Sequence, residues 1–151
     1  MIIFAADAFV EHYVGGAELT TEALFQSSLL PAAKVLTSQV SPDLMEKTRN
    51  AFWIFGNFQN LSEASMLYAA QNLNYSVLEY DYKFCRYRSP KKHVLSEGEC
   101  RCAEEAYGKL RSAFLAKSNI NWWMSVGQKE KYQKHFPFMS GEVLSSVFSE
   151  E

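Results

Sequence analysis

The stretch MIIFAADAFVEHYVGGAE, residues 1–18, carries the pattern on which the expected fold rests. Ile2–Ala6 is a continuous apolar run, too short for a helix and typical of a strand buried on both faces of a sheet. A loop follows from Asp7 to Gly16, and the next residues predict a helix from about Ala17 to Leu29 with mostly small side chains on one face. Strand, loop and helix in this order form the first half of a βαβ unit.

The same alternation continues along the rest of the chain. Short apolar runs predict further strands at 34–37, 52–55, 75–80, 120–125 and 142–148. Between them, the sequence predicts helices that begin at Ser41–Pro42, cover about 60–71 and 103–114, and end before Pro137. We therefore expect a single α/β domain over residues 1–151, a Rossmann-like three-layer domain with a mostly parallel sheet of about five or six strands.

Composition and charge argue against several classes of protein. The chain is 48% hydrophobic and 21% charged, which favours a folded domain over a disordered segment. A net charge of -2 offers no general attraction for nucleic acid, which we do not expect as a partner. The three cysteines do not form an even disulfide framework, and no apolar run approaches the roughly 18–20 residues of a membrane span, so we expect a cytoplasmic protein.

The paired glycines Gly15 and Gly16 lie between the first strand and the first helix. Main-chain amides at a helix start can bind a phosphate, and glycine lets a bulky anion approach them. The segment lacks the G-x-G-x-x-G fingerprint of dinucleotide-binding enzymes, so no nicotinamide or other cofactor is expected. The alternative is a glycine turn that only starts a helix.

Several short motifs, taken in order, resemble a known family. Asp7 follows the first strand, and after a loop Gly-Gly-Ala-Glu (15–18) opens a helix. Later motifs are Tyr80-Asp81-Tyr82, Cys85-Arg86, Gly98-Glu99-Cys100, and Trp123-Met124-Ser125 with Gln128 after it. From Asp7 to about Phe136, this order resembles the N-terminal domain of GT-B-type retaining glycosyltransferases of family 4.

The resemblance implies roles for particular residues. The amides of Gly15 and Gly16 would lie near the diphosphate of a nucleotide-sugar donor, at a cleft between two domains. Residues at the carboxyl ends of the strands would face a glycan, lipid or small-molecule acceptor, namely Asp7, His12, Asn57 and Asp81.

Tyr80 is where this chain departs from the family, which often has histidine at the end of that strand. A tyrosine hydroxyl can donate a hydrogen bond, but its usual pKa of about 10 makes it a poor base near neutral pH. The catalytic residues therefore stay unassigned, with Tyr80 and Asp81 as candidates. The alternative is that Tyr80 is a half-buried aromatic residue of the strand.

The resembling enzymes hold the nucleotide with a C-terminal domain, which we expect to be missing from this chain. Charged groups of that domain contact the donor and stabilise the leaving diphosphate, so we expect acceptor binding without sugar transfer by these residues alone. The alternative function is a stand-alone Rossmann-like binding or interaction module without catalysis.

The segment 83–92 holds five basic residues interleaved with aromatic ones. Arg86 and Arg88 are candidates for gripping a phosphorylated acceptor, and the segment as a whole could contact an anionic membrane surface. A solvated, irregular loop is the alternative.

Four soft ligand residues occur close together in the sequence: Cys85, His93, Cys100 and Cys102. A tetrahedral zinc site uses such a set, but their spacing matches no common zinc pattern. The expectation is therefore reduced structural thiols without a metal, with zinc as the alternative.

Overall fold

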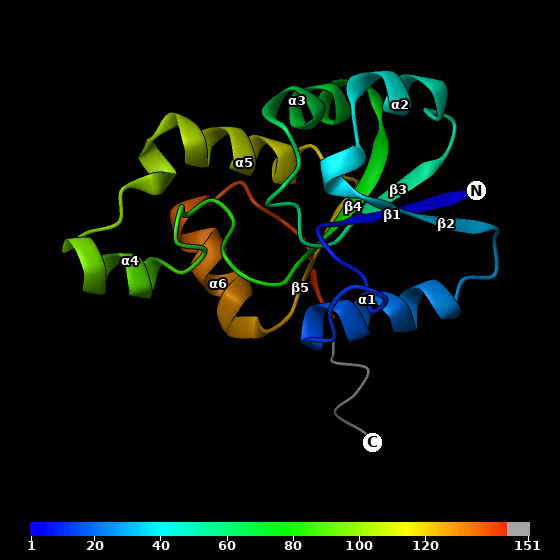
Figure 1. Cartoon of the computed structure of the whole chain (residues 1–151). Coiled ribbons are helices and arrows are strands. Elements are labelled where there is room, and N and C mark those ends of the chain that lie inside the picture. The colour runs from blue at the N-terminus through cyan, green and yellow to red at the C-terminus, as the bar shows by residue number, and fades with distance from the viewer. Residues whose placement is uncertain (145–151) are drawn as a thin grey trace.

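The computed structural model describes residues 1–144 and contains one six-stranded parallel sheet with strand order β2-β1-β3-β4-β5-β6 (Figure 1). The strands are β1 (Ile2–Ala6), β2 (Ala32–Leu36), β3 (Phe52–Phe55), β4 (Asn74–Glu79), β5 (Ile120–Trp123) and β6 (Glu142–Val143). The first strand is an internal strand of the sheet and pairs in parallel with β2 and β3. The Rossmann-like α/β class predicted from the sequence is confirmed.

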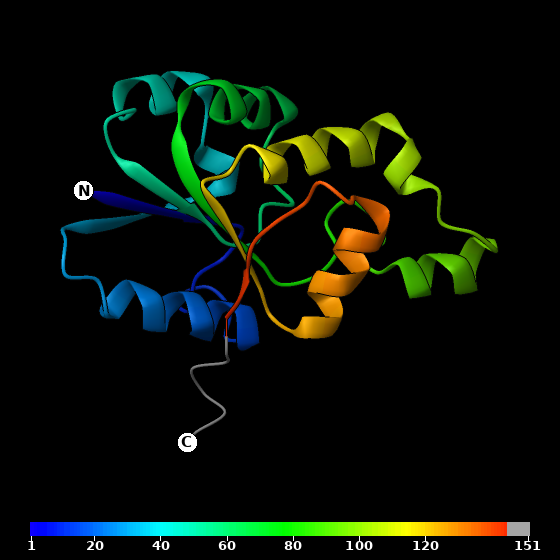
Figure 2. The ribbon, with the colours of Figure 1, turned by 180° about the vertical axis from the view of Figure 1, so that it is seen from behind.

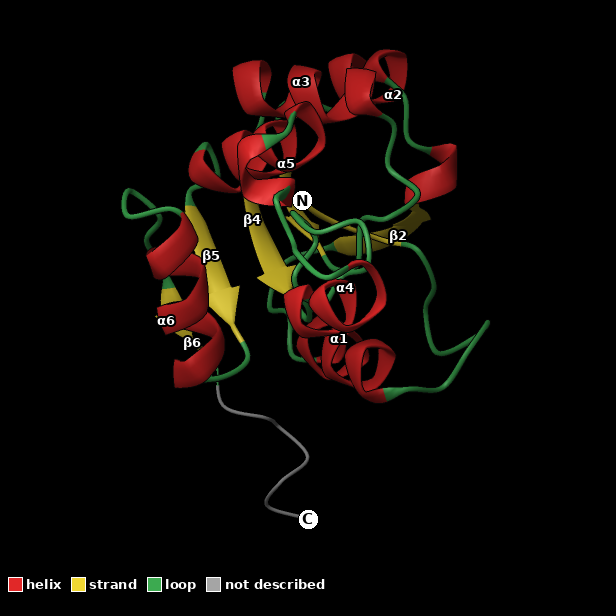
Figure 3. Ribbon diagram, turned by 90° about the vertical axis from the view of Figure 1, so that its left-hand side faces the viewer, coloured by secondary structure: helices red, strands yellow, loops and turns green. Residues whose placement is uncertain are grey.

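Helices cover both faces of the sheet. The α-helices are α1 (Gly16–Gln26), α2 (Pro42–Lys47), α3 (Glu63–Asn72), α4 (Pro90–Glu97), α5 (Ala106–Ala116) and α6 (Val126–His135). Short 3-10 helices are η1 (Thr37–Gln39) and η2 (Cys102–Glu104). Helices α2, α3 and α5 lie over one face and α1 lies under the other (Figures 1 and 3). The view from behind shows α4 in green and α6 in orange on the side of the molecule towards which the strands run (Figure 2).

The core follows from the apolar runs of the strands. On the face under α5, Phe114 packs against Phe55 and Tyr75 with ring centroids 5.3 and 4.9 Å apart. On the opposite face, Phe4 contacts Phe25 of α1 edge to face at 5.6 Å. Strand β1 buries side chains on both faces of the sheet, which accounts for its continuous apolar sequence, as predicted.

The region after β4 differs from the sequence-based expectation. The segment 83–92 was expected to be an irregular basic loop, but helix α4 begins at Pro90, and the Ser89 hydroxyl caps it by accepting from the Lys92 amide at 3.3 Å. Lys83 and Phe84 are buried, so neither is available to a ligand at the surface. Such a short, polar helix has little apolar periodicity, and the sequence pattern therefore does not reveal it.

Other boundaries shift by a few residues. The helix expected at 103–114 begins at Ala106, because Ala103 belongs to η2. The strand predicted at 142–148 is present as β6 over Glu142–Val143, while 145–148 lie outside the described residues. Among the helices of residues 1–144, none has the length and apolar character needed to cross a membrane.

Candidate functional site

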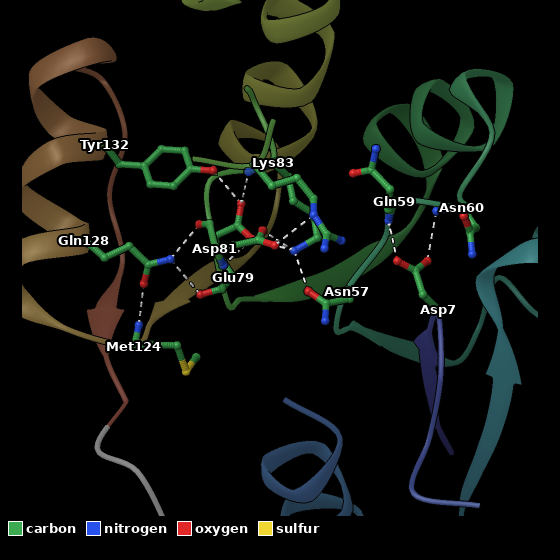
Figure 4. Close-up of polar contacts among 11 residues, drawn as sticks. Asp7, Asn57, Gln59, Asn60, Glu79, Asp81, Lys83, Met124, Gln128 and Tyr132 are labelled. Carbon is green, nitrogen blue, oxygen red and sulfur yellow. Dashed lines mark hydrogen bonds and ion pairs between the residues drawn. The ribbon is translucent and has the colours of Figure 1, made fainter. Parts of the chain in front are cut away.

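The carboxyl ends of β1, β3, β4 and β5 meet at one edge of the sheet, which is where open parallel α/β sheets bind ligands. Polar side chains from these ends, from the loops that follow them and from α6 gather there in two hydrogen-bonded groups, one around Lys83 and one around Asp7 (Figure 4). The Asp7 amide joins the two groups by donating to the Asn57 carbonyl. We call this set the edge network; it comprises Asp7, Asn57, Glu79, Asp81, Lys83, Gln128 and Tyr132.

Lys83 lies at the centre of the edge network, with 1% of its side chain exposed. Its ammonium group donates to Asn57 Oδ1 at 2.6 Å, Asp81 Oδ1 at 2.7 Å and Glu79 Oε1 at 2.9 Å. An ammonium group has three donors, so all of them are used within the protein. Burial alone would lower the pKa of Lys83, but the Glu79 and Asp81 carboxylates outweigh it and hold that pKa above its usual value. Lys83 is therefore a charged, saturated group and not a nucleophile.

Glu79 is the last residue of β4 and is fully buried. One oxygen pairs with Lys83, and the other accepts from the Tyr132 hydroxyl at 2.5 Å and from the Lys83 amide at 3.1 Å. Burial raises the pKa of Glu79, although the ammonium group of Lys83 acts in the opposite sense. The same burial raises the pKa of Tyr132, which stays protonated and able to donate.

Gln128 connects the loop after β4 to the start of α6. Its side-chain nitrogen donates to the carbonyls of Glu79 and Asp81 at 2.9 and 2.7 Å, and its oxygen accepts from the Met124 amide at 2.6 Å. These contacts occupy both ends of the Gln128 amide. Gln128 therefore holds the backbone in place and has little capacity left for a ligand.

Asp7 holds the loop that follows β3. Its carboxylate accepts from the amides of Gln59 and Asn60 at 2.8 and 2.9 Å and from the Thr37 hydroxyl, while its own amide donates to the Asn57 carbonyl at 2.8 Å. The residue predicted to face an acceptor is thus engaged with its own chain at these atoms.

Replacing Asp7 with alanine is expected to destabilise the domain by about 1–3 kcal/mol, because two main-chain amides and a hydroxyl lose their acceptor. Urea unfolding followed by circular dichroism measures the loss. Asp7→Asn, which keeps one acceptor oxygen, should lose less. Equal stabilities for Asp7→Ala and the unmodified protein would show that Asp7 does not hold this loop.

Gly15 and Gly16 lie where the sequence predicted, at the start of α1. Gly15 is the extended residue before the helix, and a Cβ there would lie 2.6 Å from Glu18 Oε1. Within residues 1–144, the amides of Gly16, Ala17 and Glu18 donate no hydrogen bond; the first helical bond is donated by Leu19 to the Gly15 carbonyl at 3.0 Å. The helix start therefore has free donors, with the carboxylate of Glu18 beside them.

Tyr80 lies between β4 and α1. Its hydroxyl shares a 2.8 Å hydrogen bond with Thr21, and its ring lies against Gly56 at the end of β3. Burial raises the pKa of Tyr80 above its usual value, although the hydrogen bond with Thr21 acts against it. Tyr80 is therefore protonated at neutral pH, and its contacts pack α1 onto the sheet.

His12, Arg86 and Arg88 lie at the surface around this edge. His12 is exposed and lines an open pocket with Phe9 and Lys34, beside β2. Arg88 Nε lies 3.4 Å from Asp81 Oδ2, so it belongs to the open side of the edge network. Arg86 pairs with Glu105 at 3.3 Å, away from these groups.

The four soft ligand residues are brought together by the fold. The thiols of Cys85, Cys100 and Cys102 and a ring nitrogen of His93 all lie within 4.8 Å of one another. Burial raises the pKa of the Cys85 thiol to about 12, with Cys100 adding to the shift, so without a metal this thiol is protonated at neutral pH.

Comparisons with protein-family models, curated proteins and solved structures find no match. Sequence analysis identified Asp7, Asn57 and Asp81 but missed the buried partners Glu79 and Tyr132. The available signal was a carboxylate directly after the apolar residues Val77 and Leu78 of a strand.

Proposed function

We propose that this chain is the acceptor-side, N-terminal domain of a sugar-nucleotide-dependent glycosyltransferase, in which the start of α1 helps to bind the donor diphosphate. The observation that carries the proposal is the glycine turn between strand β1 and helix α1. There, the amides of Gly16, Ala17 and Glu18 have no hydrogen-bond partner within residues 1–144. The order of motifs that resembles family 4 of these enzymes supports the same function.

The chemistry of the turn suits a diphosphate. Free amides and the helix dipole at an α-helix start favour a negative charge. A Cβ at Gly16 would meet nothing within 4 Å, so the approach to this residue is open, whereas the Glu18 carboxylate and the Tyr13 ring occupy the space beside Gly15. The Glu18 carboxylate lies close to these donors and must move aside, or be repelled, when an anion arrives. We therefore expect weak binding of a diphosphate by this domain alone.

The acceptor side would be formed by the accessible part of the edge network. Asp81 is 26% exposed and pairs with the exposed Arg88, so both can reach a hydroxyl or phosphate group in solution. Asn57 lies behind them against Lys83. Catalysis would need further charged groups against the donor, and we expect no sugar transfer by these residues alone.

The alternative is a stand-alone binding or interaction module without catalysis. It is favoured by the edge network, in which the polar atoms of the Lys83 and Gln128 side chains already form hydrogen bonds within the protein. Such groups stabilise a scaffold and leave few reactive atoms for chemistry.

A titration with UDP, GDP and inorganic pyrophosphate, followed by amide chemical shifts, tests the proposal. Diphosphates should shift the amides of residues 15–18, with a dissociation constant of about 1 mM or weaker, roughly −4 kcal/mol. Glu18→Gln should tighten binding about two- to five-fold, because one like charge near the dipole is worth about 0.3–1 kcal/mol. Glu22→Gln, on the same helix but paired with Lys34, is the matched control and should leave binding unchanged.

The outcomes separate the two functions. Shifts confined to the start of α1 and sensitive to Glu18 support a donor site. Amides at 15–18 that do not respond to any of the three anions at about ten times the expected dissociation constant would overturn the diphosphate site and favour the non-catalytic module.

A further inference from the structure

The segment between β4 and α5 packs into the core through Phe84 and Cys102, but its helix α4 has little apolar packing. It contains α4 and η2, and only Pro90 and His93 of α4 are buried. The large side chains Val94 and Leu95 of the same helix are 45% and 78% exposed. An amphipathic helix normally attaches through an apolar stripe, so α4 needs another means of attachment.

Three thiols and one imidazole lie at the point where this segment meets the domain. Cys85 follows β4, His93 lies on α4, Cys100 follows that helix, and Cys102 begins η2. Cys85 and Cys102 are fully buried and His93 is 7% exposed. The four residues come from different parts of the segment. A single group bound by all four side chains would therefore hold these parts together.

Three of the six distances among these atoms match the edges of a zinc tetrahedron, and all six are within 4.8 Å. His93 Nδ1 lies 3.6 Å from Cys85 Sγ and 3.5 Å from Cys102 Sγ, and the Sγ atoms of Cys85 and Cys100 are 3.7 Å apart. Zinc–sulfur bonds of about 2.3 Å and zinc–nitrogen bonds of about 2.0–2.1 Å give tetrahedral edges of about 3.5–3.8 Å. The same 3.7 Å separation is far beyond a disulfide bond, whose sulfur atoms are about 2.05 Å apart.

The surroundings of the four residues also suit a metal. His93 Nε2 lies 2.5 Å from Glu97 Oε2, one turn along α4. A carboxylate on this nitrogen places its proton there and leaves Nδ1 with a lone pair facing the thiols. The amide of Arg86 lies 3.5 Å from Cys102 Sγ, in position to donate to a thiolate, and the Tyr87 ring stacks on His93 at 4.5 Å.

Local sequence signals bring the ligands to this point. Ser89 and Pro90 start α4 so that His93 faces inward. Gly98 ends the helix in the left-handed conformation, with φ of 87°, and turns the chain back towards Cys100. The spacing of C-x7-H-x6-C-x-C is unlike the common zinc patterns because a whole helix lies between the first and second cysteines, Cys85 and Cys100.

We propose that Cys85, His93, Cys100 and Cys102 bind one Zn²⁺ in a closed structural site that fastens α4 and η2 to the domain. Three thiolates and one imidazole are a set typical of structural zinc, with four protein ligands and no position left for a substrate. Iron–sulfur clusters are usually held by four cysteines, and the chain has only three. The site does not depend on the proposed glycosyltransferase function.

Metal analysis of the full chain, purified without chelators from zinc-supplemented cells, tests the site first. The expected result is about one zinc per chain, and replacing zinc with Co²⁺ should produce the visible absorption bands of a tetrahedral thiolate site. Fewer than about 0.2 zinc per chain together with no cobalt bands would overturn the proposal.

Variants then assign the ligands. His93→Asn and Cys100→Ser should lose most of the zinc, whereas His12→Asn, on the far loop, should retain it. Glu97→Ala should weaken zinc binding about 10–100-fold because the imidazole loses the partner that orients it. Glu99→Ala, which removes an exposed carboxylate paired only with Arg101 among residues 1–144, is the matched control.

A measurement on the unmodified chain covers the case in which ligand variants fail to fold. Alkylation of the three thiols should be slow with zinc bound and fast after a strong chelator is added, and proteolysis within 86–101 should accelerate in parallel. Thiol reactivity and cleavage that are unaffected by the chelator would contradict a metal at this point.

Discussion

Lys83→Met is expected to destabilise the domain by about 3–5 kcal/mol, the cost of removing one partner from a buried ion pair. Methionine fills a similar volume, so the loss comes mainly from electrostatics. Glu79, with none of its side chain exposed, would lose the ammonium group that balances its charge. It would keep the hydrogen bond from Tyr132, which cannot supply a positive charge. Urea unfolding at pH 7 measures the change.

The loss should depend on pH in a defined direction. Burial already raises the pKa of Glu79, and removing Lys83 takes away the charge that lowers it. A carboxyl group whose pKa is higher in the folded than in the unfolded state stabilises the fold below its unfolded pKa, and this contribution disappears as pH rises through the folded pKa. The stability of the Lys83→Met variant should therefore be closest to that of the unmodified protein near pH 5. The difference in stability between the two should be largest near pH 8.

A double variant and a control variant test whether the loss comes from the unpaired charge of Glu79. Glu79→Gln combined with Lys83→Met removes the unpaired charge, so the double variant should be more stable than Lys83→Met alone at pH 8. Lys92→Met changes an exposed lysine of α4 and should alter stability by no more than about 0.5 kcal/mol. A Lys83→Met loss below about 1 kcal/mol, or one that does not vary with pH, would show that the pair is not buried as described.

Gly108→Ala is expected to destabilise the domain by about 3 kcal/mol, at the upper end of typical overpacking costs. This loss of stability is opposite to the usual effect of the substitution, because alanine normally stabilises the interior of a helix by roughly 0.5–1 kcal/mol relative to glycine. A Cβ at position 108 of α5 would lie 1.9 Å from the Cys102 carbonyl oxygen and 2.6 Å from its carbon. These are backbone atoms, so no side-chain rotation relieves the collision.

Thermal and urea unfolding measure this effect, and zinc content provides a second readout. Because Cys102 would have to move, Gly108→Ala should also hold the proposed zinc more weakly. Gly127→Ala in the first turn of α6 is the matched control, since its Cβ would meet nothing closer than Ser125 Oγ at 4.0 Å. The control should be as stable as the unmodified protein or slightly more so. A Gly108→Ala variant that behaves like the control would show that η2 and α5 are not in direct contact.

The sequence alone determined the class of fold, because that class depends on local patterns. Continuous apolar runs such as Ile2–Ala6 and Phe52–Phe55 can be buried on both faces only in a sheet covered by helices. The position of Gly15–Gly16 between strand and helix is equally local, and the structure has it there. The diphosphate role of that turn stays a proposal.

Only the tertiary structure decided how the charged and sulfur-containing residues combine. Lys83 belongs to a basic stretch in the sequence, yet it turns inward, because Glu79, Asp81 and Asn57 surround its ammonium group in the fold. The cysteines and His93 match no common zinc spacing, and a helix that the apolar pattern does not reveal brings them within reach of one another. Periodicity reports which face of an element is buried, whereas a ligand set depends on where separate segments meet in space.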